Sequence, residues 1–591
     1  MNNINVIDIE TYGYDVLTPY CVVIRYNNTY YSCVGLECLQ NIIKLIFLRC
    51  ESDTVFYAHN LTFDGVMLLN FLPKDVILDD RNTLLRKNSI YSLCFSYNNK
   101  YIFFKCSAKL LPLSLKRIAE ELNLPLKLDF DHKNVDIDSI KDPLFKKKAI
   151  EYCKRDVEIT FFFLRKFDYC VRFFLPHWKL SIYTISGLSL KIFLRLFNDD
   201  KINLNLSTKL DIMVRSAYYG GRCEVFGNAY DNEYVYHYDF SGMYSNRLKE
   251  KYPLDIPVYN DFLTDIDKPG FYYVSVESIN FELPILPYRS VDSGKLTFPN
   301  GLFSGLYWHE ELQLFIENGG VIKKIHWGLL FYSEGYPFKK FAEHCIKERK
   351  NGKIENILWK LIPNSFVGRL GLKYDAEETL IIKDDIYDPR NYTVLSDRLI
   401  QNTWLVRIKT KEKLNLNTNG NVCYAAITTS KARVLWWKTA NNVQKDGGRV
   451  LYCDTDSLFV AFKKNINLND ITYIDWDLND PNTYVKESCF FSSKFYYTVN
   501  KENFKILRLK GVPQKKIRDL DFKEIKKNFY NNTGSIKFKF LFFNKKLFNI
   551  KIDEIEKKIS FNNYDKRVFS IDKKKTTPLF IKNESTLYNN E

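Results

Sequence analysis

The feature that most constrains this chain is the stretch 451–460, in which two apolar runs flank Asp454-Thr455-Asp456. Short apolar runs on either side of a polar turn predict a β-hairpin with the acids at its tip. Two carboxylates this close repel, and each raises the pKa of the other unless cations lie between them. Mg²⁺ prefers oxygen ligands and is typically held by one or two carboxylates together with substrate phosphates. The stretch therefore predicts a metal site for phosphoryl chemistry, and an Asp-rich surface turn is the alternative for such a triplet taken alone.

Length and composition describe a large, foldable and basic chain. At 591 residues it is too long for one hydrophobic core, so several subdomains are expected. Hydrophobic residues make up 46%, which argues against global disorder. The formal net charge of +16 suits a polyanionic partner, because Lys and Arg displace condensed counterions from phosphates. The 40 Tyr and 45 Phe residues add flat surfaces on which bases can stack, although most are expected in the core.

The cysteines and the N-terminus bear on the cellular setting. The 13 cysteines are scattered, which predicts neither a disulfide framework nor a zinc cluster and indicates a reducing compartment. No apolar stretch is long enough to span a bilayer, so no membrane partner is expected. The chain reaches a predicted strand at once, without a signal peptide or an Arg-rich transit peptide. Abundant Lys, Asn, Ile, Tyr and Phe indicate an AT-rich gene, as in an organelle, plasmid or virus.

Three short motifs in the first third of the chain carry acids. Asp8 and Glu10 stand two residues apart in a strand-like run, so they share a face. Asp64 follows a second apolar run, and Tyr152 and Asp156 stand four apart in a helical segment, where they also share a face. Four carboxylates and a tyrosine can hold two metal ions about 3.5–4 Å apart for in-line hydrolysis of a phosphodiester.

Jointly and in this order, the motifs resemble the three exonuclease motifs of proofreading 3′–5′ exonucleases of the DnaQ-like type. The resemblance implies metal binding by Asp8, Glu10, Asp64 and Asp156, and a catalytic Tyr152. Lys127 resembles the lysine of the Lys-x-x-hydrophobic element that protein-primed polymerases add to this domain, which implies a catalytic role. Thr11, Asn60, Phe63 and Ser107 match positions with which the family holds a single-stranded 3′ end. At the last position the family has a Ser/Thr-Leu pair, and here Ala108 replaces the leucine.

A pair of glycines precedes the next group of motifs. In Tyr218-Tyr219-Gly220-Gly221-Arg222, paired glycines let the backbone approach phosphate, and the arginine can clamp it. This resembles the Tyr-x-Gly-Gly element with which family B polymerases pass template-primer between their exonuclease and polymerase sites, and it implies DNA contacts by Tyr219, Gly220 and Gly221.

The strand-like run 236–240 leads into a segment that resembles the first polymerase motif of family B. The match implies that Asp239 is the palm carboxylate that joins Asp454 and Asp456. It also implies that Tyr244 forms the floor of the sugar pocket and excludes a 2′-hydroxyl. Gly242 departs from the motif and is expected to change the stiffness of the backbone there.

Residues 338–372 are predicted to be helical and basic, and a solvated charged face is the plain alternative. Lys360 and Asn364 resemble the fingers motif Lys-x-x-x-Asn-Ser-x-Tyr-Gly, whose lysine grips the triphosphate. Val367 replaces the tyrosine expected beside the incoming base, and Pro363 is expected to kink the helix or remove one hydrogen bond. Further on, Lys494 and Tyr496 match a Lys-x-Tyr element that contacts the primer strand in the family.

Nearly the whole chain thus resembles a family B DNA polymerase, most closely the compact protein-primed branch of phages and organellar linear plasmids. The implied fold is mixed α/β, with a DnaQ-like (RNase H-like) 3′–5′ exonuclease domain followed by a right-hand polymerase of palm, fingers and thumb with two insertions. The expected units are exonuclease 1–165, helical linker 166–215, palm 216–251 and 423–514, terminal-protein-docking insertion 252–337, fingers 338–373, processivity insertion 374–422, and thumb with tail 515–591. A partly disordered tail after about residue 572 is the alternative there.

The resemblance implies two Mg²⁺ ions at each active site. Asp239 and Asp456 would hold the polymerase pair with help from Asp454, and the N-terminal acids would hold the other. The implied partners are primer-template DNA, dNTPs and a terminal protein, which would be a separate product because no domain precedes Asp8. A monomer is expected, in a mitochondrion or, alternatively, in the cytoplasm of a virus-infected host.

Other functions remain open at this point. A family B enzyme that extends nucleic-acid primers is the nearest alternative, and the two insertions would then be ordinary loop elaborations. A catalytically inactive DNA-binding replication factor is an alternative of another class, which the intact acids of both sites disfavour. Tyr244 and the fused exonuclease motifs disfavour a reverse transcriptase or an RNA polymerase.

Overall fold

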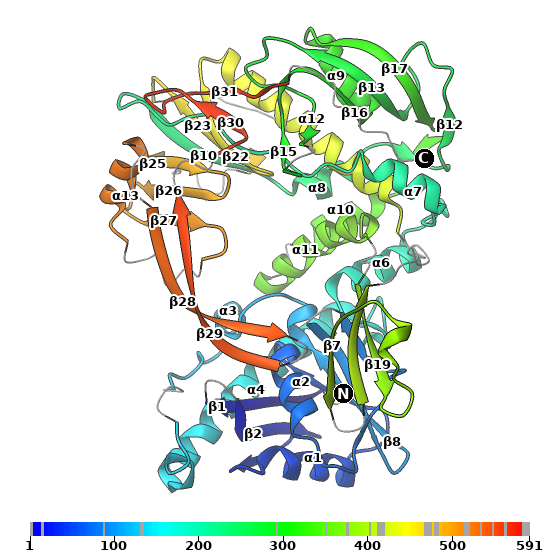
Figure 1. Ribbon diagram of the computed structural model, residues 1–591, viewed down its shortest axis with the longest axis vertical. Coiled ribbons are helices and arrows are strands. Elements are labelled where there is room, and N and C mark those ends of the chain that lie inside the picture. Colours follow the sequence, from blue (N-terminus) through cyan, green and yellow to red (C-terminus); the bar gives the residue numbers. More distant parts are fainter. Residues whose placement is uncertain are drawn as a thin grey trace.

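The computed structural model describes residues 4–13, 17–86, 89–130, 135–290, 293–349, 352–373, 377–400, 403–409, 420–465, 476–477, 484–512, 520–531, 535–546, 549–560 and 564–581. Two large sheets, the first mixed and the second antiparallel, lie at opposite ends of the molecule, and helices and a long hairpin connect them (Figure 1). None of the described helices has the length and apolarity needed to cross a membrane. All 13 cysteines are free thiols.

The first sheet belongs to the N-terminal part and has the strand order β3-β2-β1-β4-β8-β7-β5, with β6 paired to β7. Its strands are β1 (Asn5–Tyr12), β2 (Thr18–Tyr26), β3 (Thr29–Val34), β4 (Thr54–Ala58), β5 (Ile77–Leu78), β6 (Leu84–Arg86), β7 (Ser89–Tyr97) and β8 (Lys100–Cys106). Strand β1 is central, because it pairs antiparallel with β2 and parallel with β4. Around the sheet lie α1 (Cys38–Arg49), α2 (Leu61–Asn70), η1 (Ser107–Lys109), α3 (Leu115–Leu122), η2 (Ser139–Lys141) and α4 (Pro143–Val171).

Helix α4 begins where the sequence favours a helix start. Pro143 occupies the first turn, and the Asp142 carboxylate accepts the Phe145 N–H at 2.8 Å, which caps the helix. The helix then runs unbroken to Val171, so the expected domain boundary at residue 165 falls inside it. After it follow α5 (Trp178–Ser181), α6 (Ile185–Leu196) and α7 (Thr208–Arg215).

The second sheet has the order β27-β26-β25-β10-β23-β22-β9, with β24 paired to β10. Its strands are β9 (Cys223–Val225), β10 (Tyr234–Phe240), β22 (Arg449–Asp454), β23 (Ser457–Phe462), β24 (Trp476–Asp477), β25 (Tyr484–Ser492), β26 (Phe495–Asn500) and β27 (Lys505–Leu509). Strands β22 and β23 form the hairpin predicted for residues 451–460, with the acids at its turn. Helix α12 (Val422–Lys445) packs against β22, and α8 (Met243–Arg247) follows β10.

A third sheet, of order β12-β17-β13-β16-β32, lies in the segment between β10 and the central helices. It contains β12 (Val258–Asn260), β13 (Gly270–Ser278), β16 (Asn300–Trp308), β17 (Val321–Leu330) and, from the far end of the chain, β32 (Phe580–Ile581). Helix α9 (His309–Glu317) packs on it, and short pairs β11 (Tyr252–Pro253) with β18 (Glu334–Gly335) and β14 (Tyr288–Arg289) with β15 (Leu296–Thr297) flank it.

Two antiparallel helices, α10 (Lys339–Glu348) and α11 (Lys353–Leu370), lie between the large sheets and pack on α6 and on each other (Figure 1). Pro363 lies inside α11, and the helix continues through it to Leu370. After α11 comes a small sheet of β19 (Glu377–Lys383), β20 (Val394–Ile400) and β21 (Thr403–Lys409), with the turn η4 (Pro389–Asn391). This sheet docks on the N-terminal part, because Leu405 is buried in the core of the first sheet and Arg398 donates to Asn70 at 2.9 Å.

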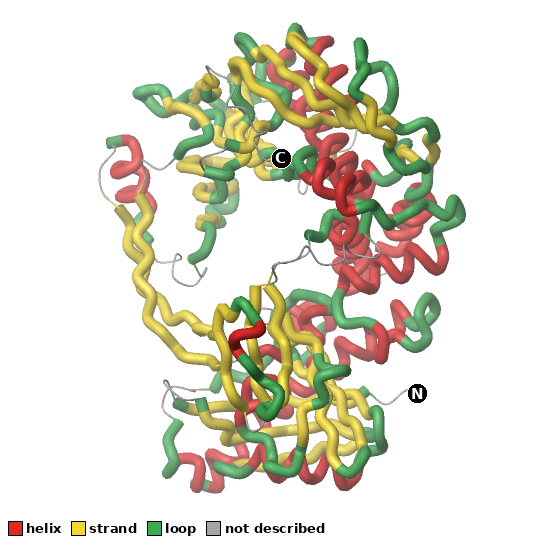
Figure 2. The backbone as a smooth tube through the Cα atoms, turned by 45° about the vertical axis from the view of Figure 1, so that its right-hand side comes forward, coloured by secondary structure: helices red, strands yellow, loops and turns green. Residues whose placement is uncertain are grey.

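The last part of the chain reaches from the second sheet to the N-terminal part and returns. Helix α13 (Phe522–Tyr530) leads into a long hairpin of β28 (Ser535–Lys546) and β29 (Asn549–Ser560), and β29 contacts α2 of the N-terminal part. In Figure 2 the long hairpin, in yellow, lies at the left of the molecule, and helices, in red, lie at the right. Beyond the hairpin, β30 (Arg567–Phe569) pairs with β31 (Thr576–Pro578), and β32 joins the third sheet. The tail is thus ordered past residue 572 as far as 581, and residues 582–591 lie outside the described part.

Candidate active sites

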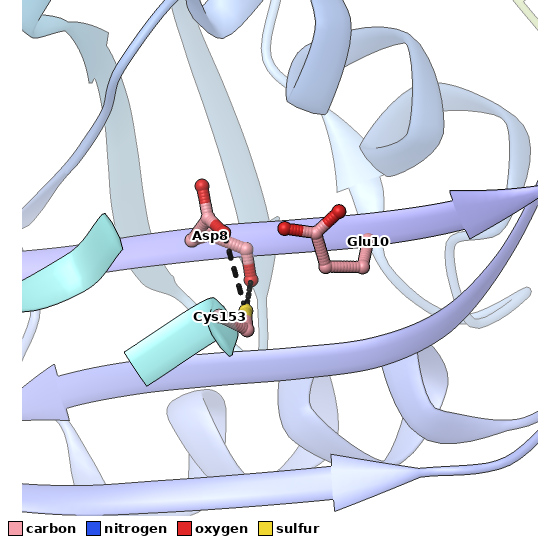
Figure 3. Close-up of side chains that lie close together, drawn as sticks. All are labelled: Asp8, Glu10 and Cys153. Carbon is pink, nitrogen blue, oxygen red and sulfur yellow. Dashed lines mark hydrogen bonds between the residues drawn. The ribbon is translucent and has the colours of Figure 1, made fainter. Parts of the chain in front are cut away.

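The first candidate site is built on strand β1. Asp8 and Glu10 stand two residues apart on this strand, and both are partly exposed (Figure 3). Asp64, which is buried in the first turn of α2, accepts the backbone N–H of Ile9 at 3.2 Å with its Oδ1. That bond fixes α2 to β1 at the residue between the two acids, so the fold brings these three carboxylates together.

The fourth acid, Asp156, comes from α4 and is paired with Lys127. The Lys127 ammonium contacts Asp156 Oδ2 and lies 4.7 Å from the centre of the Tyr152 ring. Asp156 is 3% exposed, and its other oxygen, Oδ1, has no hydrogen-bond partner among the described residues. All the predicted exonuclease carboxylates, with Tyr152 and Lys127, therefore converge on one place.

The electrostatics of this site indicate a deficit of positive charge. Burial, with the charge of Asp156, raises the pKa of Asp8 to about 7. Burial and the neighbouring acids also raise the pKa of Glu10 and of Asp64 well above their ordinary values. The pKa of Asp156 is raised by burial as well, although Lys127 opposes that shift. A divalent cation would relieve this repulsion, and with the unpartnered oxygen of Asp156 the site fits one.

A thiol also lies in this group of acids. Cys153, fully buried on α4, has its Sγ 3.2 Å from Asp8 Oδ2 and 3.3 Å from the Asp8 carbonyl oxygen (Figure 3). Burial raises the pKa of this thiol well above its ordinary value, so it donates to Asp8 as S–H. The sequence places Cys153 directly after Tyr152 but gives no sign that it meets Asp8, 145 residues away.

The residues predicted to hold a single-stranded 3′ end divide into two kinds. Thr11 and Phe63 are partly exposed, and Asn60 is exposed at the start of α2 in the left-handed region, with a φ of 70°. Ser107 is fully buried, lies 3.0 Å from His59 Nδ1 and donates to the Ala58 carbonyl at 3.2 Å. The predicted contact of Ser107 with DNA is therefore not available to its side chain, which positions His59 instead.

The second candidate site lies where β10 meets the β22–β23 hairpin. Asp239 on β10 and Asp454 on β22 both stand opposite Ser457, and the Phe240 N–H donates to the Asp456 carbonyl at 2.7 Å. Desolvation of its carboxyl and the charge of Asp239 raise the pKa of Asp456, and Lys360 partly offsets this. The three predicted carboxylates thus meet where β10 ends beside the turn of the β22–β23 hairpin, in the interior of the second sheet, with Lys360 of α11 close by.

The turn between Asp454 and Asp456 is held in an unusual conformation. Thr455 has a φ of 63°, a left-handed value that is a clear outlier for a β-branched residue. Its N–H donates to the Arg222 carbonyl at 2.7 Å, which helps to maintain that conformation. A Cβ on Gly221 would come within 2.6 Å of Thr455 Cγ2, so the second glycine of the pair is required by this close contact.

Around that glycine pair the structure corrects one prediction. Arg222 is 2% exposed, forms an ion pair with Glu224 at 2.8 Å and packs against the ring of Phe298, so it cannot clamp phosphate. Tyr219 is buried against Tyr307, and Gly220 is exposed. Of these two residues, Gly220 is therefore the one that is open to solvent, and the side chain of Tyr219 is not.

Other predicted residues gather near the second site. Lys494 Nζ lies 3.3 Å from Asp454 Oδ1, and its backbone N–H donates to the buried Tyr452 hydroxyl at 3.0 Å. Tyr496 packs beside the Tyr452 ring, with centroids 5.0 Å apart. Lys360 and Asn364 stand four residues apart on α11, where they share a face.

Comparison with known proteins decides the family. The model of the family "DNA polymerase type B, organellar and viral" matches residues 48–144 and 139–442. The chain belongs to the organellar and viral type B DNA polymerases. A "Probable DNA polymerase" of Neurospora intermedia is 25% identical over 71% of this chain, and the match spans 49% of that protein's length. The DNA-directed DNA polymerase of Enterobacteria phage PRD1 is 23% identical over 75% of this chain and 73% of its own.

The fold of this type B polymerase is that of a solved one. Phi29 DNA polymerase, in its complex with primer-template DNA and incoming nucleotide, superimposes with a TM-score of 0.70 over 95% of this chain and 100% of its own, at 17% identity. The expected fold, an exonuclease domain followed by palm, fingers and thumb, is confirmed. In these terms the first site lies in the exonuclease domain and the second in the palm.

The departures from the polymerase motifs have structural explanations. Gly242 caps α8, which carries Tyr244, with a φ of 52°, a left-handed conformation that suits glycine. Val367 is 3% exposed and packs in the core, so this side chain faces the protein interior rather than an incoming base.

One buried pair was not anticipated from the sequence. Arg433 of α12 binds both carboxylate oxygens of Glu311 on α9, at 2.7 and 2.8 Å, and donates to the Tyr219 carbonyl at 2.8 Å. Both side chains are almost fully buried. Charges within apolar helical runs were the only signal in the sequence, and the separation of 122 positions along the chain conceals the pairing.

Proposed function

We propose that this chain is a DNA-directed DNA polymerase with a 3′–5′ proofreading exonuclease. The observation that carries the proposal is the presence of two separate clusters of acidic residues, one at each large sheet, in a chain of the type B polymerase family. The cluster at the first sheet would remove nucleotides from a 3′ end, and the cluster at the second sheet would add them. Primer-template DNA and dNTPs are the proposed substrates.

At the palm site, the chain's own residues would position the reactants. Asp239 and Asp456 would hold divalent metal, and Asp454 would assist. Mg²⁺, when bound, would lower the pKa of the primer 3′-hydroxyl and neutralise charge on the phosphates. Lys360 would contact the triphosphate from α11, and Lys494 and Tyr496 would contact the primer strand. Tyr244, with Asn364 on α11, would contact the incoming nucleotide and exclude a 2′-hydroxyl.

At the exonuclease site, Asp8, Glu10, Asp64 and Asp156 would hold the metal. Lys127, paired with Asp156, would limit the negative charge near the scissile phosphate, and Tyr152 would orient the attacking water. Thr11 and Phe63, which are partly exposed, and Asn60, which is exposed, would hold the single-stranded 3′ end.

Separate substitutions test the two-site proposal. Asp456→Ala should abolish primer extension and leave degradation of single-stranded 3′ ends intact. Asp8→Ala combined with Glu10→Ala should do the reverse. Both activities are measured on labelled primer-template with Mg²⁺, and folding is checked by circular dichroism. Loss of both activities from either folded variant would contradict the proposal.

We further propose that synthesis starts from a protein hydroxyl. Four strands of the third sheet lie within residues 252–337, and the small sheet β19–β21 lies within residues 374–422. These two segments are the proposed insertions, the first to dock a terminal protein and the second for processivity and strand displacement. A Ser, Thr or Tyr of a separate terminal protein would then have to reach Asp239 and Asp456 along the path later taken by duplex.

The test of protein priming is incubation of the enzyme with the terminal protein of its replicon, labelled dNTP and Mg²⁺. A nucleotide bound covalently to that protein, and absent with Asp456→Ala, would support the proposal. Efficient replication from a nucleic-acid primer, with no adduct, would favour the alternative. We propose a mitochondrial location, with the cytoplasm of a virus-infected host as the alternative; organelle fractionation distinguishes the two.

A further inference from the structure

Strand β9 (Cys223–Val225) is the end strand of the second sheet and supports the strand that carries Asp454. It pairs with β22, so that Cys223 stands opposite Asp454 and Val225 stands opposite Tyr452. Among the described strands, none pairs with the other edge of β9. The backbone groups on that edge therefore need other partners, because buried N–H and C=O groups are rarely left unsatisfied.

A segment from the far end of the chain supplies those partners. The Tyr564 hydroxyl accepts the Val225 N–H at 2.8 Å and donates to the Val225 carbonyl at 3.4 Å. The Thr576 hydroxyl donates to the same carbonyl at 3.0 Å. We call residues 564–578 the strap. Its strands β30 and β31, in red in Figure 1, lie beside the second sheet.

The strap is built into the palm rather than laid on its surface. Arg567 is 1% exposed; its Nε donates to the Thr576 hydroxyl at 2.7 Å, and its Nη2 donates to the Glu282 carbonyl at 3.0 Å. The arginine thereby joins β30 to β31 and both to the segment that holds the third sheet. A Cβ on Gly227, just beyond β9, would come within 2.1 Å of the Lys574 carbonyl oxygen, so the two backbones pass at a distance that only glycine allows.

Through β9 the strap bears on the palm acids. The Lys566 ammonium donates to the Cys223 carbonyl at 3.0 Å, so the residue opposite Asp454 is also held from the strap side. A displacement of β9 would carry β22, and the carboxylate at its end, with it. Misplacement of a reacting group by about 1 Å can cost about a hundredfold in rate, even when the altered residue is far from the chemistry.

We propose that the strap is a positioning element of the palm site, in which the hydroxyls of Tyr564 and Thr576 hold β9 and thereby set the position of Asp454. The inference rests on the proposed polymerase activity and adds two residues that lie outside all the motifs recognised in the sequence. It also links the long hairpin to the palm, because β29 ends at Ser560 and the chain is bound to β9 four positions later. The exonuclease acids lie at the other large sheet, so the strap should affect extension alone.

The test removes single hydroxyls from the full chain. Tyr564→Phe and Thr576→Val should each lower kcat for primer extension about tenfold or more, with KM for dNTP, primer-template affinity and degradation of single-stranded 3′ ends within about twofold of the wild type. Thr576→Ser keeps the hydroxyl and should keep kcat. Asp565→Ala is the matched control, because its pair with Lys295 is exposed, and it should leave kcat unchanged.

Hydrogen exchange gives a second readout that does not depend on activity. In both hydroxyl-deleted variants the backbone N–H groups of residues 449–457 should exchange about fivefold faster or more, and those of β1 should not change. For an active enzyme, an unchanged kcat in both variants would overturn the inference. Equal loss of extension and 3′-end degradation, with a lowered Tm, would overturn it too, because that result reports general destabilisation.

The same measurements separate this inference from the function on which it rests. A wild-type chain that extends no primer would refute the polymerase function. Exchange alone would then test the strap: faster exchange in the variants would support it, and exchange equal to that of the wild type would overturn it.

Discussion

At the scale of single residues, the palm site depends on how closely two backbone segments approach. Thr455 stands between two of the palm acids in a left-handed conformation, and Gly221 lies against its side chain. Any side chain at Gly221 would displace Thr455, and with it the carboxylates on either side. The position of the acids is thus set partly by a residue that carries no functional group.

Gly221→Ala should therefore reduce primer extension at least tenfold in a protein that still folds. The new Cβ would lie 2.6 Å from Thr455 Cγ2, which must move. Gly220→Ala is the comparison, because its Cβ would meet nothing within 4 Å, and it should retain more extension. Extension rates on primer-template measure both, and equal losses in the two variants would refute the steric explanation.

The sequence could predict some residues of the two sites and not others. The carboxylates could be located because each follows an apolar run or shares a helical face with another functional residue, and local periodicity carries that information. Arg222 and Ser107 could not be judged, because their burial depends on Phe298 and His59, which are distant or outside the motif. Cys153 was overlooked for the same reason, since only tertiary register brings α4 against β1.

At the scale of elements, the pair between Arg433 and Glu311 joins α12 to α9 and holds the Tyr219 carbonyl. The third sheet is thereby connected to the loop that packs on the palm turn. Sequence patterns predicted the hairpin and the helices, because these need only local periodicity. They did not predict this connection, or the docking of β21 on the first sheet, because long-range partners leave no period in the sequence.

Glu311→Ala should destabilise the fold by about 3–5 kcal/mol, because it leaves the Arg433 guanidinium buried without its partner. Urea and thermal denaturation measure the loss. Lys340→Ala is the matched control, since its pair with Asp199 is exposed and should contribute nothing measurable. Equal stability of Glu311→Ala and the wild type would show that the pair does not support the structure.

At the scale of the whole molecule, the charge of +16 is the property that bears on DNA. If the chain neutralises about six or more phosphates, its affinity for primer-template should fall roughly a thousandfold or more between about 50 and 200 mM salt. Equilibrium binding across a salt series measures the slope. A flat dependence would mean that the basic segments do not form the DNA-binding surface.

The pairing of β32 with β16 constrains when this protein can finish folding. Asn300 and Phe580 are adjacent in the third sheet but about 280 residues apart in the chain. At roughly 5–20 residues per second, translation exposes β16 tens of seconds before β32 exists. The edge of β16 is open during that interval and offers unpaired backbone groups to any other extended strand. Fast translation, or a chaperone that covers this edge, would therefore raise the yield of native protein, and a bulky fusion after β32 would lower it.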